Sequence, residues 1–164
     1  MTILLINICR EKLHFYEFVK PIEDILSKNK IRFFTKHYKE IDKKDLEKAD
    51  KIIICGTSLK DNEFLNYMDK FQWIKDYKKP IFGICGGAHV IGLILGNKLK
   101  KIKEIGLKKI FIKNFLGINE EREVYHLHQF YVLPEIYNKG NIYATLFHPE
   151  VRNKDIIVNF CNNA

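Results

Sequence analysis

The stretch from residue 80 to residue 96 reads PIFGICGGAHVIGLILG and decides the fold. Its first five residues form an apolar run that is typical of a strand buried on both faces. Cys85 follows directly, and after Gly86 and Gly87 come residues that favour a helix. A cysteine that only packs in a core normally lies within a regular element. A thiol between a strand and a helix, next to two glycines, therefore indicates a functional position.

Short apolar runs alternate with helical patterns on both sides of this stretch. Strands are expected at 2–8, 31–35, 51–55, 80–84 and 142–147, and helices at 13–28, 64–74, 86–95 and about 153–160. Asp61 is expected to cap the helix at 64–74. Such alternation predicts an α/β fold, namely a doubly wound, mostly parallel sheet with flanking helices. Residues 107–113 and 121–132 predict a small antiparallel portion.

The size and composition of the chain limit the broad class of protein. The 164 residues, 46% of them hydrophobic, predict a single domain spanning 1–164. No apolar run is long enough to cross a bilayer, and charged residues follow the short N-terminal apolar run, so neither a membrane segment nor a targeting segment is expected. The four cysteines are far apart and lack CxxC spacing, which fits a reducing cytoplasm better than disulfides or a zinc cage.

The formal net charge of +8 leaves two interpretations open. A basic surface can bind RNA or an acidic protein partner. The alternative is a solvated surface rich in lysine. The second interpretation is favoured, because the lysines are spread along the chain and no arginine cluster or RNA-stacking aromatic motif accompanies them.

Three residues lie just after the ends of predicted strands. Gly56 follows 51–55, Cys85 follows 80–84 and His148 follows 142–147. Ligands bind at the carboxyl ends of the strands in sheets of this kind. We therefore expect Gly56, Cys85 and His148 to share one site.

The chemistry expected at this site is nucleophilic catalysis. A thiolate at the start of a helix is stabilised by the helix dipole and free N–H groups, which can also hold an oxyanion. Residues 146–151, LFHPEV, supply the base and the orienting acid that such a nucleophile needs, as His148 and Glu150.

In these two segments the chain resembles the class I glutamine amidotransferases of the Cys-His-Glu type. The nucleophile segment of that family, G-[IV]-C-x-G, corresponds to residues 83–87, and its F-H-P-E signature corresponds to residues 147–150. The resemblance implies a flavodoxin-like fold and a glutaminase. In such an enzyme Cys85 attacks the side-chain amide of glutamine, His148 protonates the departing ammonia, and water releases glutamate from a thioester.

The resemblance also implies a group of oxyanion and substrate-binding residues: Gly56, Gly86, His89 and His128. Two positions depart from the family pattern. The turn at 55–58 reads Cys-Gly-Thr-Ser and keeps one glycine where the family usually has Gly-Gly-Pro. His89 stands where many members have glutamine.

His126 and His128 alternate within a predicted strand and therefore face the same side. With His148 they suggest a three-histidine metal site as an alternative. That alternative is not favoured, because no carboxylate or cysteine stands at ligand spacing beside them. No metal and no cofactor are expected.

Three functions remain in competition. The first is a glutaminase subunit that supplies ammonia to a separate synthase, because the chain has no P-loop or GxGxxG motif with which to bind ATP itself. The second is a cysteine hydrolase of the same superfamily, either a peptidase or a γ-glutamyl hydrolase. The third is a catalytically weak binding or regulatory subunit, which the altered turn at Gly56 and His89 would fit.

Overall fold

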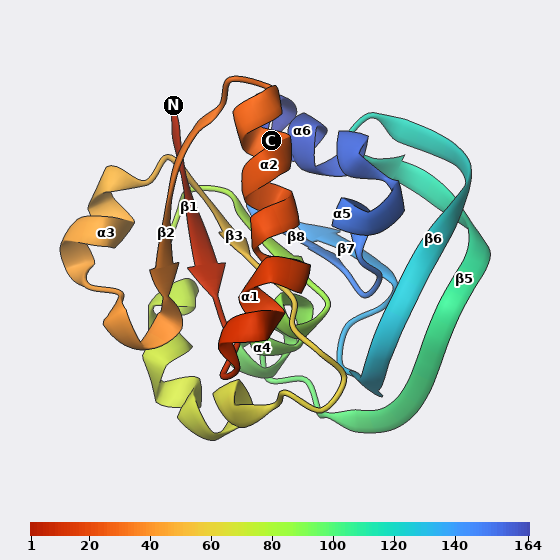
Figure 1. The fold of residues 1–164 in the computed structure, drawn as a ribbon, viewed down its shortest axis with the longest axis horizontal. Coiled ribbons are helices and arrows are strands. Elements are labelled where there is room, and N and C mark those ends of the chain that lie inside the picture. Colours follow the sequence, from red (N-terminus) through yellow and green to blue (C-terminus); the bar gives the residue numbers. More distant parts are fainter.

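A six-stranded sheet runs through the centre of the structure, a computed structural model covering residues 1–164 (Figure 1). Its strands, in spatial order, are β2 (Arg32–His37), β1 (Thr2–Asn7), β3 (Lys51–Ile54), β4 (Ile81–Ile84), β8 (Ile142–Thr145) and β7 (Ile136–Lys139). The first five pair in parallel, and β7 pairs antiparallel with β8. The predicted doubly wound, mostly parallel sheet is confirmed, whereas β7 was not predicted.

The sheet is buried on both faces, and β1 shows why the sequence demands this. Ile3 and Leu5 belong to one core cluster, whereas Leu4 and Ile6 belong to the other, and all four side chains are fully buried. Successive side chains of a strand point to opposite faces, so a continuous apolar run needs cover on both sides.

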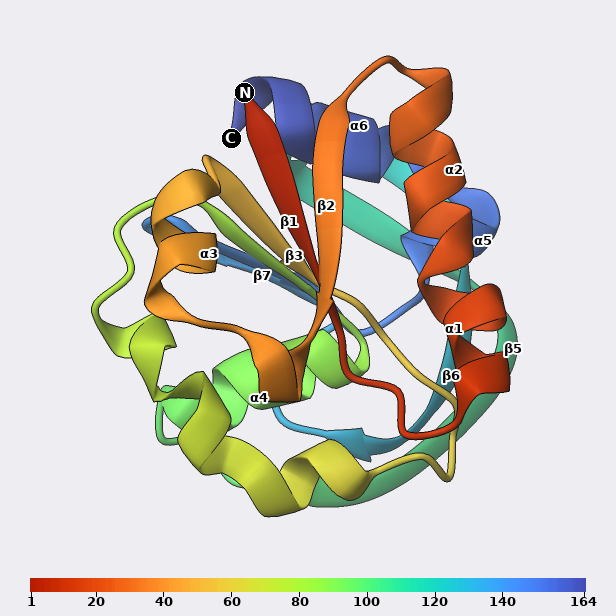
Figure 2. The ribbon, with the colours of Figure 1, turned by 60° about the vertical axis from the view of Figure 1, so that its left-hand side comes forward.

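The helices supply that cover in two layers (Figure 2). On one face lie α1 (Lys12–Phe18), α2 (Lys20–Lys28) and α6 (Lys154–Asn163), with the short α5 (Pro149–Arg152) beside them. On the other lie α3 (Lys43–Lys48), α4 (Gly86–Ile94) and the 3-10 segment η2 (Glu63–Lys75). None of these helices is long and apolar enough to span a bilayer.

Two helix predictions were wrong in detail. The single helix expected at 13–28 is interrupted at Val19, because Pro21, in the first turn of α2, lacks the N–H that would continue the preceding helix. Residues 63–75 form 3-10 turns with a kink at Tyr67, and Asn62 precedes them. Asp61 is therefore not their cap, and its carboxylate contacts other groups described below.

A long antiparallel hairpin packs beside the sheet and forms the outer wall on the right of Figure 1. It consists of β5 (Lys100–Phe115) and β6 (Ile118–Tyr131). The antiparallel portion predicted at 107–113 and 121–132 is confirmed, but it is longer than expected. Ile112 and Val124 point inward and join the core, which fixes the hairpin against the rest of the chain.

Candidate active site

Three strand ends meet at one edge of the sheet, as the sequence predicts. β3, β4 and β8 are neighbours or next neighbours in the sheet and end at Ile54, Ile84 and Thr145. Gly56, Cys85 and His148 follow these ends. The backbone N–H of Cys85 donates to the carbonyl of Thr145 at 2.8 Å, so the turn after β4 is tied to the end of β8.

Cys85 has an unusual backbone conformation. Its φ of 48° and ψ of −100° put a residue with a side chain in a region that normally favours glycine. The residue is the N-cap of α4, and it is 4% exposed. A strained strand-to-helix turn of this kind can present a nucleophile at the top of a sheet.

Glycines let α4 approach the strands closely enough to make this turn. A Cβ atom at Gly87 would lie 2.1 Å from the carbonyl oxygen of Ile54, and one at Gly83 would lie 2.7 Å from backbone atoms of Gly87. Both contacts are with backbone and cannot be relieved by a side-chain movement. Gly83 and Gly87, on either side of Cys85, are therefore required by packing.

His148 and Glu150 form a buried pair. His148 Nδ1 lies 2.7 Å from Glu150 Oε1, and neither side chain is exposed to solvent. The backbone N–H of His148 donates to the carbonyl of Tyr125 at 2.9 Å, which anchors the residue to β6. The pair thus has the geometry in which a carboxylate orients an imidazole.

A backbone carbonyl of the hairpin lies close to both the thiol and the imidazole. Cys85 Sγ donates to the oxygen of Leu127 at 3.5 Å, and His148 Nε2 is 3.4 Å from the same oxygen. Sequence reasoning missed Leu127, because a carbonyl group is common to every residue type and leaves no signal in the sequence.

The electrostatics of the pair favour a protonated imidazole. Burial by itself lowers the pKa of His148, but Glu150 and Cys85 outweigh burial and raise the pKa well above its ordinary value. An imidazolium beside a thiol is the arrangement that activates cysteine nucleophiles.

The four other predicted site residues gather around Cys85. Gly56 packs against the imidazole of His148, since a Cβ atom there would lie 2.8 Å from His148 Cε1. Gly86 begins α4, and Gly86, His89 and His128 line the cavity at Cys85. All seven predicted site residues are thus brought together in one region.

His89 is a neutral group inside this cavity. It is 3% exposed, its Nδ1 has no hydrogen-bond partner, and burial, together with His128 and His148, lowers its pKa to about 3. At neutral pH it can donate or accept one hydrogen bond to a bound molecule without carrying charge.

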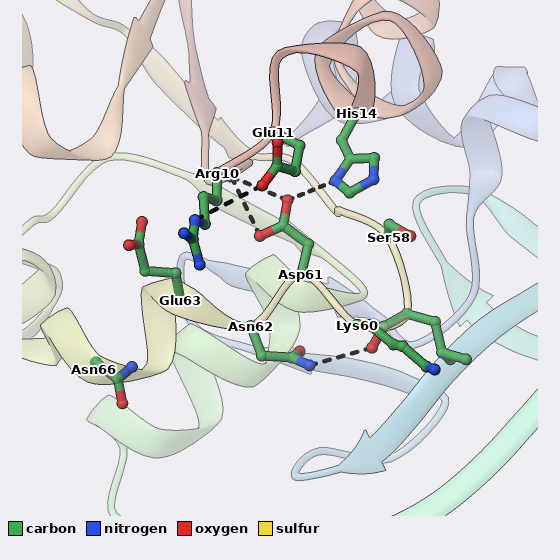
Figure 3. A pocket seen from close by; sticks show the side chains of 10 residues that line it. Arg10, Glu11, His14, Ser58, Lys60, Asp61, Asn62, Glu63 and Asn66 are labelled. Carbon is green, nitrogen blue, oxygen red and sulfur yellow. Dashed lines mark hydrogen bonds and ion pairs between the residues drawn. The ribbon is translucent and has the colours of Figure 1, made fainter.

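The loop after β3 separates two cavities. The one at Cys85 has a volume of about 10 Å³, whereas its neighbour measures about 760 Å³ and is lined almost entirely by polar side chains (Figure 3). Ser58, Leu59 and Asn62 line both. This loop is therefore the wall between Cys85 and the larger cavity.

Asp61 holds that loop in place. Its carboxylate accepts hydrogen bonds from the backbone N–H of Arg10 at 3.0 and 3.2 Å and from the hydroxyl of Thr57 at 3.0 Å. His14 Nδ1 lies 2.7 Å from the same carboxylate (Figure 3). Asp61 thereby links the loop after β1, helix α1 and the turn that contains Gly56.

Comparison with known proteins gives this geometry a context. A model of the family "Glutamine amidotransferase class-I" matches residues 15–162. A glutamine-hydrolyzing GMP synthase subunit of Thermoplasma acidophilum is 31% identical over 150 residues, which cover 74% of this chain and 75% of that protein. Imidazole glycerol phosphate synthase subunit HisH of Bacteroides thetaiotaomicron is 27% identical over 154 residues, covering 69% of this chain and 78% of that protein.

The fold has close counterparts among solved structures. A crystal structure of a GMP synthase subunit protein from Thermoplasma acidophilum superimposes with a TM-score of 0.81 at 24% identity and covers 99% of this chain and 92% of that one. A glutamine amidotransferase from Thermotoga maritima gives a TM-score of 0.65 at 20% identity, covering 92% of this chain and 76% of that one.

Proposed function

Because the chain belongs to the class I glutamine amidotransferases, we propose that it hydrolyses glutamine through Cys85 and supplies the ammonia to a separate synthase. In this proposal Cys85 attacks the side-chain amide and His148, oriented by Glu150, protonates the leaving ammonia. Water then hydrolyses the γ-glutamyl thioester, and His148 takes up a proton from that water.

The observation that carries the proposal is the convergence of Cys85 and His148 on one oxygen. Both side chains contact the carbonyl of Leu127, and Glu150 occupies the far side of the imidazole. In this proposal nucleophile, base and orienting acid follow one another in the order that acyl transfer requires. The N–H groups of Gly86 and the Gly56 turn are proposed to hold the oxyanion, and His89 and His128 to contact the substrate.

Substrate access is proposed to require movement of the loop that carries Asp61. A cavity of about 10 Å³ has room for about one water molecule, and small-molecule sites occupy roughly 300–1,000 Å³. Displacing residues 58–62 would join this cavity to the larger one beside it. The free chain should therefore turn over glutamine slowly, and a docked synthase should accelerate it by favouring the open loop.

The separate synthase is proposed to be the remaining subunit of a GMP synthase, working with this chain in the cytoplasm. Of the two curated relatives described above, the GMP synthase subunit is the more identical. An imidazole glycerol phosphate synthase is the alternative. A net charge of +8 would complement an acidic docking face on the synthase.

The test measures glutamate release from glutamine by the chain alone and after addition of each candidate synthase. Weak activity alone, stimulated by one synthase and reduced by salt, is the expected result. The Cys85→Ala variant should remain inactive in every mixture. Hydrolysis of γ-glutamyl peptides in preference to glutamine would identify a hydrolase instead, and silence with every synthase would identify a regulatory subunit.

A further inference from the structure

The inner face of the hairpin carries a cluster of histidine and carboxylate side chains that extends away from the reacting atoms. Glu104 on β5 pairs in register with His128 on β6, and His126 lies two residues along the same strand. The candidate ligand atoms of these three side chains all lie within 4.8 Å of one another. A carboxylate therefore does join the histidines, from the opposite strand, where sequence spacing could not reveal it.

The two imidazoles are buried without enough protein partners. His126 and His128 are 1% and 2% exposed. His126 Nδ1 and His128 Nε2 lie 3.1 Å apart, but His126 Nε2 and His128 Nδ1 have no hydrogen-bond partner. Buried polar atoms are nearly always paired, because leaving one unpaired is costly. His126 Nε2, which faces the carboxylate of Glu135, is thus an imidazole nitrogen available to a ligand.

The charges around the cluster favour a cationic ligand. Glu104 Oε1 lies 3.8 Å from His128 Nε2, and Glu135 Oε1 lies 3.4 Å from His126 Nε2. The ammonium of Lys108 contacts both carboxylates, at 3.6 Å for Glu104 and 2.6 Å for Glu135. The two carboxylates beside the imidazoles thus already bind one cation, the ammonium of Lys108. The lysine side chain is half exposed and can move into solvent.

We propose that Glu104, His126 and His128 bind a divalent transition-metal ion of the zinc class. Two neutral imidazoles and a carboxylate are a donor set that zinc uses, with a fourth position left for water or for Glu135. Imidazole binds metal in its neutral form. The ion displaces the ammonium of Lys108 into solvent.

The ion would act through the hairpin, and Nδ1 of His128, on the other edge of the ring, would remain available for the proposed contact with the substrate. His126 and His128 flank Leu127, whose carbonyl contacts Cys85 and His148. An ion held by both histidines and by the facing strand would fix that carbonyl in position. His148 takes no part, because its Nδ1 already contacts Glu150.

The experiment measures Zn²⁺ binding by calorimetry with the full chain in a Cys85→Ser background, which removes the thiolate of the active site as a competing ligand. One ion per chain with a Kd below about 1 µM is expected. Co²⁺ should give the visible spectrum of a tetrahedral site without a thiolate charge-transfer band. The thermal midpoint should rise with Zn²⁺ concentration.

Three variants of the Cys85→Ser protein test the site: one should weaken Zn²⁺ binding, one should strengthen it, and one is a control. Glu104→Gln should weaken binding at least about tenfold, since even outer-shell changes cost about 10–100-fold. Lys108→Met should strengthen binding about two- to fivefold, because it removes a competing cation from an exposed ion pair. Lys109→Met, whose residue is exposed on the outer face, is the matched control and should change nothing. A Kd above about 1 µM in the Cys85→Ser protein, or a Kd that Glu104→Gln leaves unchanged, would contradict the proposed site.

Discussion

The parallel sheet and the β5–β6 hairpin contribute to the same site in different ways. The sheet contributes residue types at the ends of its strands, with Cys85 after β4 and His148 after β8. The hairpin contributes a backbone oxygen, that of Leu127, which contacts both of them. The sheet thus determines which chemical groups are present, and the hairpin determines how they face one another.

The two regions differ in how far their contribution can be read from the sequence. A strand end followed by glycine and a reactive side chain is visible in a sequence, because its chemistry needs specific residue types. A carbonyl presented by a long antiparallel pair depends only on register. Changes in the sheet half should therefore remove the reaction, whereas changes elsewhere should alter access or alignment.

The largest effect is expected for the pair on the sheet side. His148→Ala should lower kcat by about 10⁶-fold and Glu150→Gln by about 10⁴-fold, because an orienting group contributes less than the base it orients. Steady-state glutamate release with the stimulating synthase provides the measurement. Equal losses in the two variants would assign Glu150 a structural role.

A smaller effect is expected for the turn after β3. In Gly56→Ala the new Cβ would lie 2.8 Å from His148 Cε1 and 3.3 Å from the carbonyl oxygen of Ile84, so either the imidazole or the turn must shift. Gly56→Ala should therefore lower kcat by about 10²–10³-fold, which is the cost of losing one aligned oxyanion donor.

The kcat for glutamate release and the midpoint of thermal unfolding should both be measured for this variant. Lys60→Ala, whose residue is exposed in the same loop and does not line the cavity at Cys85, is the matched control and should keep both properties. Wild-type kcat in Gly56→Ala would remove the turn from the mechanism.

Much of the fold could be predicted from the sequence, and the reasons are local. Alternating apolar runs and helical patterns located the parallel strands. Residues 83–87 and 147–150 indicated the residues that we propose as nucleophile, base and orienting acid. The break at Val19 was not predicted, and it depends on the proline two residues later. The 3-10 turns of η2 were not predicted either, because they keep the apolar pattern of a helix in a tighter geometry.

The wall of the active site was the main omission. Asp61 has the residue type of a helix cap, but its partners are Arg10 and His14, about fifty residues earlier, and Thr57 in its own loop. The metal cluster was missed for a similar reason, since Glu104 meets His128 only through the register of the hairpin. Long-range pairing of this kind has no signature in one sequence.

A still smaller effect is expected for Asp61, which lies in neither the sheet nor the hairpin. Its carboxylate holds the loop between the two cavities. Asp61→Asn should accelerate labelling of Cys85 by small electrophiles about fivefold, because each lost hydrogen bond favours the open loop by about 1 kcal/mol. Glu63→Gln is the control, since Glu63 lines the same polar cavity but contacts Lys39. Slower or unchanged labelling would show that the loop does not limit access.

The smallest effect is expected in the pH dependence of stability. The raised pKa of His148 means that its contribution to the free energy of unfolding is complete below the unfolded value of about 6.5 and is lost as pH rises through the folded value. The unfolding free energy of wild type should therefore fall from about neutral pH upward relative to that of His148→Gln. Parallel pH curves for the two proteins would contradict the charged pair.

The most direct test of the proposed reaction is to locate the nucleophile. A glutamine analogue with an electrophile at its γ carbon should be incubated with wild type, Cys85→Ala and His148→Ala, followed by intact-mass measurement and peptide mapping. One adduct per chain is expected, on Cys85, and it should be absent in Cys85→Ala and form much more slowly in His148→Ala. An adduct on Cys9, Cys55 or Cys161, or labelling that persists in Cys85→Ala, would contradict the proposed reaction.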